Sequence, residues 1–91
     1  MTAEEGGALS IGEVASELDV PSHVLRFWET RFAEIRPAKR GNRRVYGPAD
    51  LALLRGIRQL LYTEGLTVKG VQKVLAEQGA GFVREIGTLK A

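Results

Sequence analysis

The chain has 91 residues, enough for one small domain, and its 44% hydrophobic and 26% charged residues are typical of a folded protein. It contains no cysteine, which excludes a disulfide framework, a thiolate metal site and a cysteine nucleophile. No apolar run approaches the roughly 18 residues that a membrane-spanning helix needs, and the N-terminus has no secretory signal pattern. We therefore expect a cytoplasmic protein with no membrane partner.

The net charge of +2 is unevenly distributed along the chain. Residues 1–25 contain five acids and no lysine or arginine, whereas residues 26–46 contain seven bases and two acids. Such a local concentration of positive charge is typical of a protein that binds a polyanion. Residues 1–8 are acidic and offer little to bury, so we predict a flexible leader there.

Two short helices are predicted after this leader. Ser10 followed by Glu13 is the pattern of a capping box, and the apolar residues after it recur at helical spacing until a helix end near Asp19. Val20-Pro21 favours a turn, and proline is well placed in the first turn of a second helix over about 21–33. Two helices joined by about three residues predict a helix-turn-helix.

The second helix has a clear apolar side. Leu25, Trp28 and Phe32 recur at core spacing, so we assign Trp28 and Phe32 to packing. Phe27 is turned about 100° from Trp28. We expect Phe27 to pack under the next element, with contact to a sugar face as the alternative.

A small β-hairpin is predicted next. Ile35-Arg36-Pro37 and Arg43-Arg44-Val45-Tyr46 have an extended pattern, and Gly41-Asn42 between them tolerates the positive φ of a tight connection. We predict a two-stranded hairpin with a basic tip over 36–46, which we call the wing. Such a hairpin is marginally stable alone and must lean on the helices.

Two further helices complete the predicted domain. Gly47-Pro48-Ala49-Asp50 has the residues of a helix start, and this third helix should end at Gly65. Thr67 is expected to cap a fourth helix that Gly79 closes. The predicted fold is mainly α, with about four helices and a small two-stranded wing, and the domain covers 9–79.

Residues 80–91 are harder to assign. They contain three apolar anchors, but Gly81 and Gly87 weaken any long helix. We interpret this segment as a tail, either a remnant or the start of a dimerisation segment.

The combined pattern resembles the MerR family of bacterial transcription regulators. The matching motifs are Arg26-Phe27-Trp28-Glu29, Arg43-Arg44-Val45-Tyr46, Pro48-Ala49-Asp50 and Gly65-Leu66-Thr67. The similarity covers about Ser10 to Leu75, and the combined spacing is specific. The chain departs from the family pattern in two places. Pro21 replaces a usual Ser or Thr, and Phe27-Trp28 replaces a usual pair of tyrosines.

The resemblance implies a winged helix-turn-helix that binds double-stranded DNA. In the family, a homodimer grips a promoter and twists it into register for RNA polymerase. Family members usually continue into a long dimerising helix, for which this chain is too short, so we expect the isolated chain to be monomeric or weakly self-associating. A basic residue at the start of the last helix can touch the DNA backbone in the family, which singles out Lys69.

Twelve residues are predicted to contact DNA. Several of them have alternatives that the sequence leaves open. Arg26 could pair with an acid such as Glu29 or Glu13, His23 could simply face solvent, Asn42 could serve the turn, and Tyr46 could belong to the core. The four bases of the wing could form a solvated loop, and Lys69 could lie on a solvated helix face. The full set is Ser22, His23, Arg26, Arg31, Arg36, Lys39, Arg40, Asn42, Arg43, Arg44, Tyr46 and Lys69.

The leading functional hypothesis is sequence-specific duplex binding by a nucleoid-associated transcription regulator. An excisionase-like architectural protein that bends DNA is the first alternative, and a protein-interaction module that uses the basic wing is the second. Cooperative footprints at phased sites would favour the first alternative, and an isolated promoter palindrome would favour the regulator. The residues show no catalytic constellation, so we predict no enzyme activity, no cofactor and no metal site.

Overall fold

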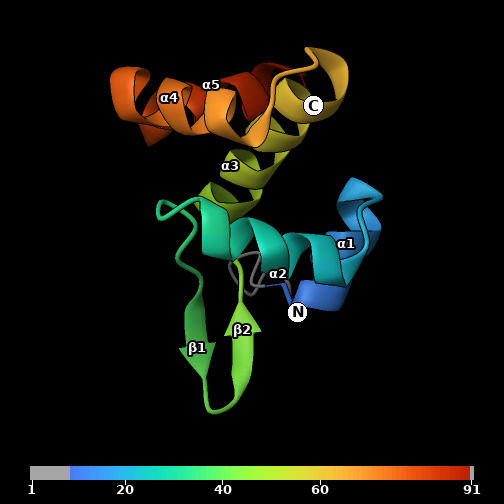
Figure 1. Cartoon of the computed structure of the whole chain (residues 1–91). Helices are drawn as coiled ribbons and strands as arrows, with labels where there is room; N and C mark the ends of the chain where they lie inside the picture. Colours follow the sequence, from blue (N-terminus) through green and yellow to red (C-terminus); the bar gives the residue numbers. More distant parts are fainter. Residues whose placement is uncertain (1–8, 91) are drawn as a thin grey trace. The chain divides into compact units, whose positions relative to one another are not determined.

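The computed structural model describes residues 9–90, so the leader predicted over 1–8 lies outside the described residues. Within that range the chain is mainly helical and carries one two-stranded hairpin, which confirms the predicted winged helix-turn-helix (Figure 1). The described part has five α-helices, one more than predicted. The chain forms two compact units, Met1–Leu51 and Ala52–Ala91, and the boundary between them falls within the third helix.

The first unit contains the helix-turn-helix and the wing. Its elements are α1 (Ile11–Leu18), α2 (Ser22–Arg31), β1 (Ala38–Arg40) and β2 (Arg43–Val45). The hairpin projects from the pair of helices α1 and α2 (Figure 1).

The sequence signals at both ends of α1 are confirmed. The backbone N–H of Ser10 donates to Oε1 of Glu13 at 2.8 Å, and the N–H of Glu13 donates to Oγ of Ser10 at 3.2 Å, so both halves of the capping box are present. The helix ends at Asp19, which adopts a left-handed conformation with φ of 57°. Pro21 has an extended ψ of 146° and precedes α2 instead of forming its first residue.

The core of the first unit confirms most of the predicted packing. Trp28 and Phe32 are buried as predicted, whereas the prediction that Phe27 packs is wrong, because 46% of this residue is exposed. The buried apolar residues of this unit are Val14, Leu18, Val20, Leu25, Trp28, Phe32, Ile35 and Tyr46.

The first strand of the wing lies three residues later than its predicted extended segment. β1 begins at Ala38, and Ile35-Arg36-Pro37 is the last part of the connection from α2, residues 32–37. The two-residue turn at Gly41-Asn42, with φ of 62° at Gly41, places Arg40 directly opposite Arg43 and so requires β1 to run up to the turn. Ile35 is buried in the core.

One pairing at the base of the wing was not predicted. Leu9 forms an isolated antiparallel bridge with Tyr46, in which the N–H of Leu9 donates to the Tyr46 carbonyl at 2.8 Å and the N–H of Tyr46 donates back at 2.7 Å. This bridge joins the end of β2 to the residue that precedes the α1 cap.

The third helix begins in the first unit and continues into the second. In α3 (Pro48–Arg58) the N–H of Gly47 donates to Oδ2 of Asp50 at 2.9 Å, as the predicted start requires. A π-helical turn, η1 (Gln59–Thr63), follows α3 directly.

The second unit continues with α4 (Val68–Gln78) and α5 (Ala80–Lys90). The N–H of Gly70 donates to Oγ1 of Thr67 at 3.0 Å, which confirms the predicted cap. Gly79 closes α4 with φ of 89°.

One of the two tail glycines, Gly87, has a role opposite to the one expected. Residues 80–90 form a helix, and a Cβ added at Gly87 would lie 2.0 Å from the Ala52 carbonyl oxygen and 2.8 Å from the Gly56 nitrogen. A Cβ added at Gly56 would lie 2.0 Å from the Val83 carbonyl oxygen. Glycine at both positions therefore lets the backbones of α3 and α5 approach more closely than any side chain permits.

This close approach predicts opposite effects for two glycine substitutions in α5. Gly87→Ala should lower the free energy of unfolding by about 3 kcal/mol, because the methyl group would overlap backbone atoms that cannot move aside. Gly81→Ala should raise it by about 0.5–1 kcal/mol, because that Cβ would meet only the end of the Arg84 side chain, at 3.6 Å, and alanine favours the helix. Urea unfolding of both variants is the test, and a G87A variant as stable as G81A would contradict the packing.

Candidate nucleic-acid interface

The buried side of α2 determines which of its residues face outward. Leu25 and Trp28 are buried, so the opposite side of the helix, at positions 23, 26, 27 and 30, is presented to solvent. His23 and Arg26 are exposed on this side and Ser22 is half-buried in the first turn. Three predicted contact residues thus lie on the first two turns of one helix.

The start of α2 is electrostatically suited to an anion. Pro21 provides no side-chain hydrogen bond to the first turn, and that turn contains no acid. The N–H groups at a helix start and the helix dipole both favour negative charge there. A phosphate oxygen is a chemically matched partner for this end of the helix.

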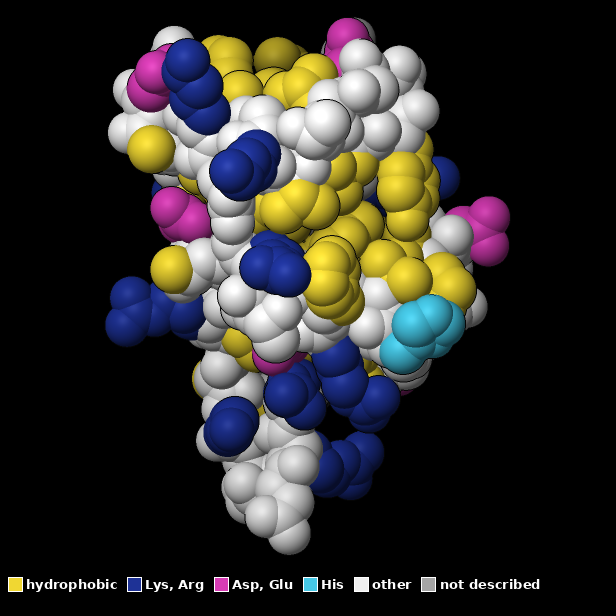
Figure 2. Space-filling view, viewed as in Figure 1, with side chains coloured by type: hydrophobic (Ala, Val, Ile, Leu, Met, Phe, Trp, Pro, Cys, Tyr) yellow, Lys and Arg dark blue, Asp and Glu magenta, His cyan; other side chains and the backbone are white. Residues whose placement is uncertain are grey.

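The wing places positive charges directly opposite one another. Its register pairs Lys39 with Arg44 and Arg40 with Arg43. Like charges at facing positions destabilise a hairpin, so both cross-strand pairs carry an electrostatic cost. Lys and Arg side chains gather along this hairpin in the space-filling view (Figure 2).

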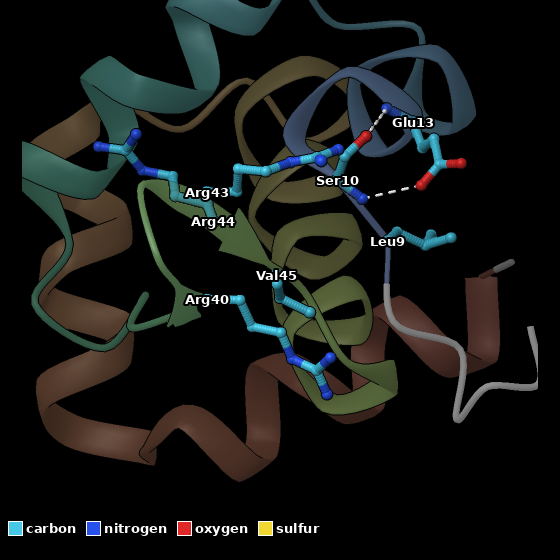
Figure 3. Close-up of a pocket in the computed structure, with 7 residues that line it drawn as sticks. All are labelled: Leu9, Ser10, Glu13, Arg40, Arg43, Arg44 and Val45. Carbon is cyan, nitrogen blue, oxygen red and sulfur yellow. Dashed lines mark hydrogen bonds between the residues drawn. The ribbon is translucent and has the colours of Figure 1, made fainter.

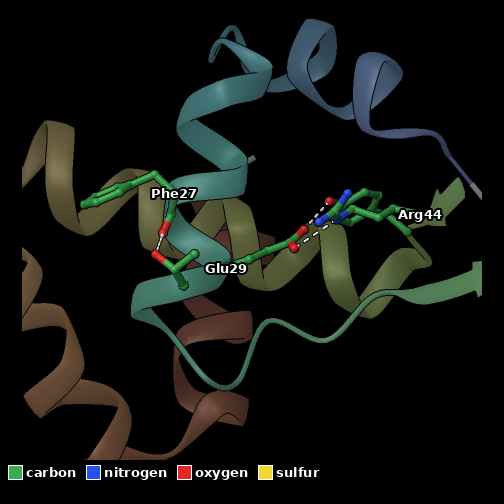
Figure 4. Close-up of polar contacts among 5 residues, drawn as sticks. Phe27, Glu29 and Arg44 are labelled. Carbon is green, nitrogen blue, oxygen red and sulfur yellow. Dashed lines mark hydrogen bonds and ion pairs between the residues drawn. The ribbon is translucent and has the colours of Figure 1, made fainter. Parts of the chain in front are cut away.

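Glu29 of α2 offsets one of these charges. Nε of Arg44 donates to Oε1 of Glu29 at 3.0 Å, and the Tyr46 hydroxyl donates to Oε2 of the same carboxylate at 2.6 Å (Figure 4). We call these three residues the Glu29 anchor. One of the two acids that the sequence offered as partners for Arg26 is therefore bound to the wing instead.

The sequence left open whether Tyr46 contacts DNA or belongs to the core, and in the structure it lies in the core. Only 1% of the residue is exposed, and its hydroxyl is bound to Glu29. Burial raises the pKa of Tyr46, the hydrogen bond and negative charge of Glu29 raise it further, and the Arg44 charge opposes them. The hydroxyl consequently keeps its proton at neutral pH and can donate it in the hydrogen bond to Glu29.

Arg26 converges with the wing on one open hollow. Arg43 and Arg44 of β2 and Asn42 of the turn line this hollow together with Arg26, and the first residues of α1 complete it. Its volume is about 290 Å³. Three arginines and the N-terminus of α1 thus line a space open to solvent, and only Arg44 of the three is paired with Glu29, which favours an anionic occupant.

A second open pocket of about 240 Å³ lies beside the wing (Figure 3). Arg40 lines it together with Arg43, Arg44 and the α1 cap. Arg43 and Arg44 leave β2 on opposite sides, and Arg43 extends toward Ser10 (Figure 3). The two neighbours therefore have different surroundings: Arg44 is held by Glu29, and Arg43 lies at the start of α1.

The remaining predicted residues are not part of these two hollows. Arg36 and Lys39 are exposed in the connection to the wing and on β1. The Arg31 guanidinium carbon lies 5.3 Å from the centre of the Phe27 ring. Lys69 is exposed in the first turn of α4 and belongs to the second unit.

Two further observations concern residues 9–90. In that range no group of three or more His, Cys, Asp or Glu side chains comes together to hold a metal ion. None of the described helices is both long and apolar enough to span a bilayer.

Residues 9–78 match the family model described as MerR HTH family regulatory protein. The chain belongs to the MerR family. The resemblance inferred from the motifs is thereby confirmed. MerR proteins are DNA-binding transcription regulators and not enzymes. No curated protein and no solved structure matches the chain.

The main residue that sequence reasoning missed is Glu29. It was considered only as a partner for Arg26, although it is one of just two acids among residues 26–46. The available signal was the presence of so few acids in so basic a segment. Its partners could not be identified because they lie 15 and 17 residues away along the chain.

The raised pKa of Tyr46 predicts a specific alkaline behaviour. Tyr46→Phe should lower the free energy of unfolding by about 1.5–3 kcal/mol at neutral pH, the usual range for a hydrogen bond to a charged group. Because the pKa is higher in the folded than in the unfolded chain, where it is about 10, this contribution is fully present below about pH 10. It should decline as the pH rises further, by at most about 1.4 kcal/mol per pH unit.

Urea unfolding of the wild type and of Y46F from pH 7 to 11 measures this difference. We expect the difference between the two proteins to be constant up to about pH 9.5 and then to shrink. A difference that stays constant to pH 11 would show that the pKa of Tyr46 is not raised in the folded protein.

Proposed function

We propose that the first unit binds duplex DNA in a sequence-specific manner and that the protein regulates transcription from the bound site. In this proposal α2 enters the major groove and the wing lies on the flanking backbone or minor groove. The proposal extends the general DNA-binding role of the MerR family to named residues.

The observation that carries the proposal is the uncompensated positive charge of the wing. Arg40 and Arg43 face each other across the hairpin, and among the described residues neither has an acidic partner within ion-pair distance. A closely spaced row of phosphates would remove this repulsion and release bound counterions. The hollow that contains Arg26, Arg43 and Arg44 supports the same conclusion, since it combines the wing and α2 on one anion-binding surface.

Base recognition falls to the first two turns of α2. Residues near the start of a recognition helix are those closest to base edges. Arg26 has a fork of donors that can bind a guanine edge, and Ser22 and His23 lie in the turn before it. Wing and helix arginines would then supply most of the affinity, and these three side chains most of the choice of bases.

The regulatory setting follows the family pattern. We propose that the chain acts on promoters as a homodimer and twists the bound DNA. RNA polymerase would be the partner that recognises the twisted promoter. A dimer requires a two-fold symmetric site whose halves are separated by one helical turn or a multiple of it. Such a protein would work in the bacterial cytoplasm, associated with the nucleoid.

Salt dependence tests the proposed wing contacts. If about five phosphates are neutralised, the logarithm of the affinity should fall against the logarithm of the salt concentration with a slope of about −4 to −5. Arg43→Ala should make this slope shallower by about one. Lys73→Ala on α4 is the matched control, because Lys73 is exposed and pairs only at 3.9 Å with Glu77, and it should leave the slope unchanged.

Fluorescence anisotropy with a labelled duplex between about 50 and 200 mM salt provides the slopes. An equal change in R43A and K73A would argue against a wing contact. Failure of the wild type to bind any duplex would overturn the proposed function itself.

A further inference from the structure

Phe27 is an exposed aromatic residue on the helix that the proposed function places in the major groove. It lies four residues after His23, on the same outward side of α2. The residue is 46% exposed, while the other aromatic residue of this helix, Trp28, is 2% exposed. Single exposed apolar residues are common on protein surfaces, so exposure alone does not indicate a function. The position of this ring on the outward side of α2 is the informative observation.

The ring has defined surroundings. The Arg31 guanidinium carbon lies 5.3 Å from the ring centre, which is within the range of a cation–π contact. Figure 4 shows Phe27 on the side of α2 away from Arg44. Phe27 therefore lies on the outward side of the helix but apart from the wing, which the Glu29 anchor holds on the other side.

The nearest polar side chain on the outward side of α2 after Phe27 is already engaged. The Thr30 hydroxyl donates to the Phe27 carbonyl at 2.6 Å, a bond within the helix that uses the donor of Thr30. Phe27 therefore presents an apolar ring on the outward side of α2, directly after Arg26. An apolar ring in a major groove has one matched group on the bases, the C5-methyl of thymine.

We propose that Phe27 contacts a thymine methyl group and makes the protein prefer thymine at one position of its target. The inference rests on the proposed duplex binding and adds a base preference to it. Arg31 would act as a positioning residue that holds the ring through the cation–π contact. The phenyl ring has no hydroxyl group, so its contribution to the interface is an apolar contact and not a bond to phosphate.

Replacing thymine with uracil in the bound duplex removes only the methyl group and leaves base pairing intact. A target is first selected from a random pool of duplexes, and then its thymines are replaced by uracil one at a time. At one position the wild type should lose about three- to fivefold in affinity, the value expected for exposing one methyl group. Phe27→Ala should bind the thymine duplex about as weakly as the wild type binds the uracil duplex. Its affinity should fall less than twofold when the same thymine is replaced by uracil.

Two variants control this experiment. Phe82→Ala removes a phenyl ring of similar exposure, 42%, from α5 and should retain the full response to uracil. Phe27→Leu keeps an apolar contact and should retain part of the response, which separates loss of contact from loss of folding. Circular dichroism of each variant reports its helical content.

The outcomes separate this inference from the function on which it rests. A wild type that binds its target equally with thymine and uracil at every position overturns the role of Phe27 and leaves the proposed function standing. An equal response to uracil in F27A and in the wild type does the same. Absence of binding to any duplex overturns both.

Discussion

One carboxylate, that of Glu29, joins the wing of the first unit to α2. A hairpin of two three-residue strands is at best marginally stable in water, and here two of the three cross-strand pairs place like charges opposite each other. Glu29 accepts from Arg44 on β2 and from the buried Tyr46 hydroxyl just after it. The side chains of Arg44 and Glu29 are 32% and 16% exposed, so solvent screens this pair less than a fully exposed one.

The Glu29 anchor places two neighbouring arginines, Arg43 and Arg44, in different surroundings. Successive residues of a strand point to opposite sides, so Arg44 can be held by α2 while Arg43 extends toward the start of α1. One positive charge is used to fix the wing, and the next remains beside Arg26 in the open hollow. In the second unit the corresponding constraint is steric: Gly56 and Gly87 permit backbone contact between α3 and α5 that no larger residue allows.

Local signals made much of this structure predictable, and distant pairings account for most of what was missed. The capping box at Ser10, the turn at Gly41-Asn42 and the Thr67 cap depend on residues that are adjacent or three apart, so the sequence alone identified them. The Leu9–Tyr46 bridge and the Glu29 anchor join residues far apart in sequence, which no local pattern encodes. Gly87 was misjudged for the same reason, because its helix propensity was considered without its partner helix.

Duplex affinity of Glu29→Ala tests most directly whether the anchor organises the interface, since two effects of the substitution have opposite signs. Removing a negative charge near phosphates should strengthen binding, whereas releasing the wing should weaken it. The matched control is Glu34→Ala, which removes the same charge from an exposed position in the segment after α2. If Glu29 positions the wing, E29A binds a duplex more weakly than the wild type while E34A binds equally or more tightly. Tighter binding by a folded E29A variant would contradict this account.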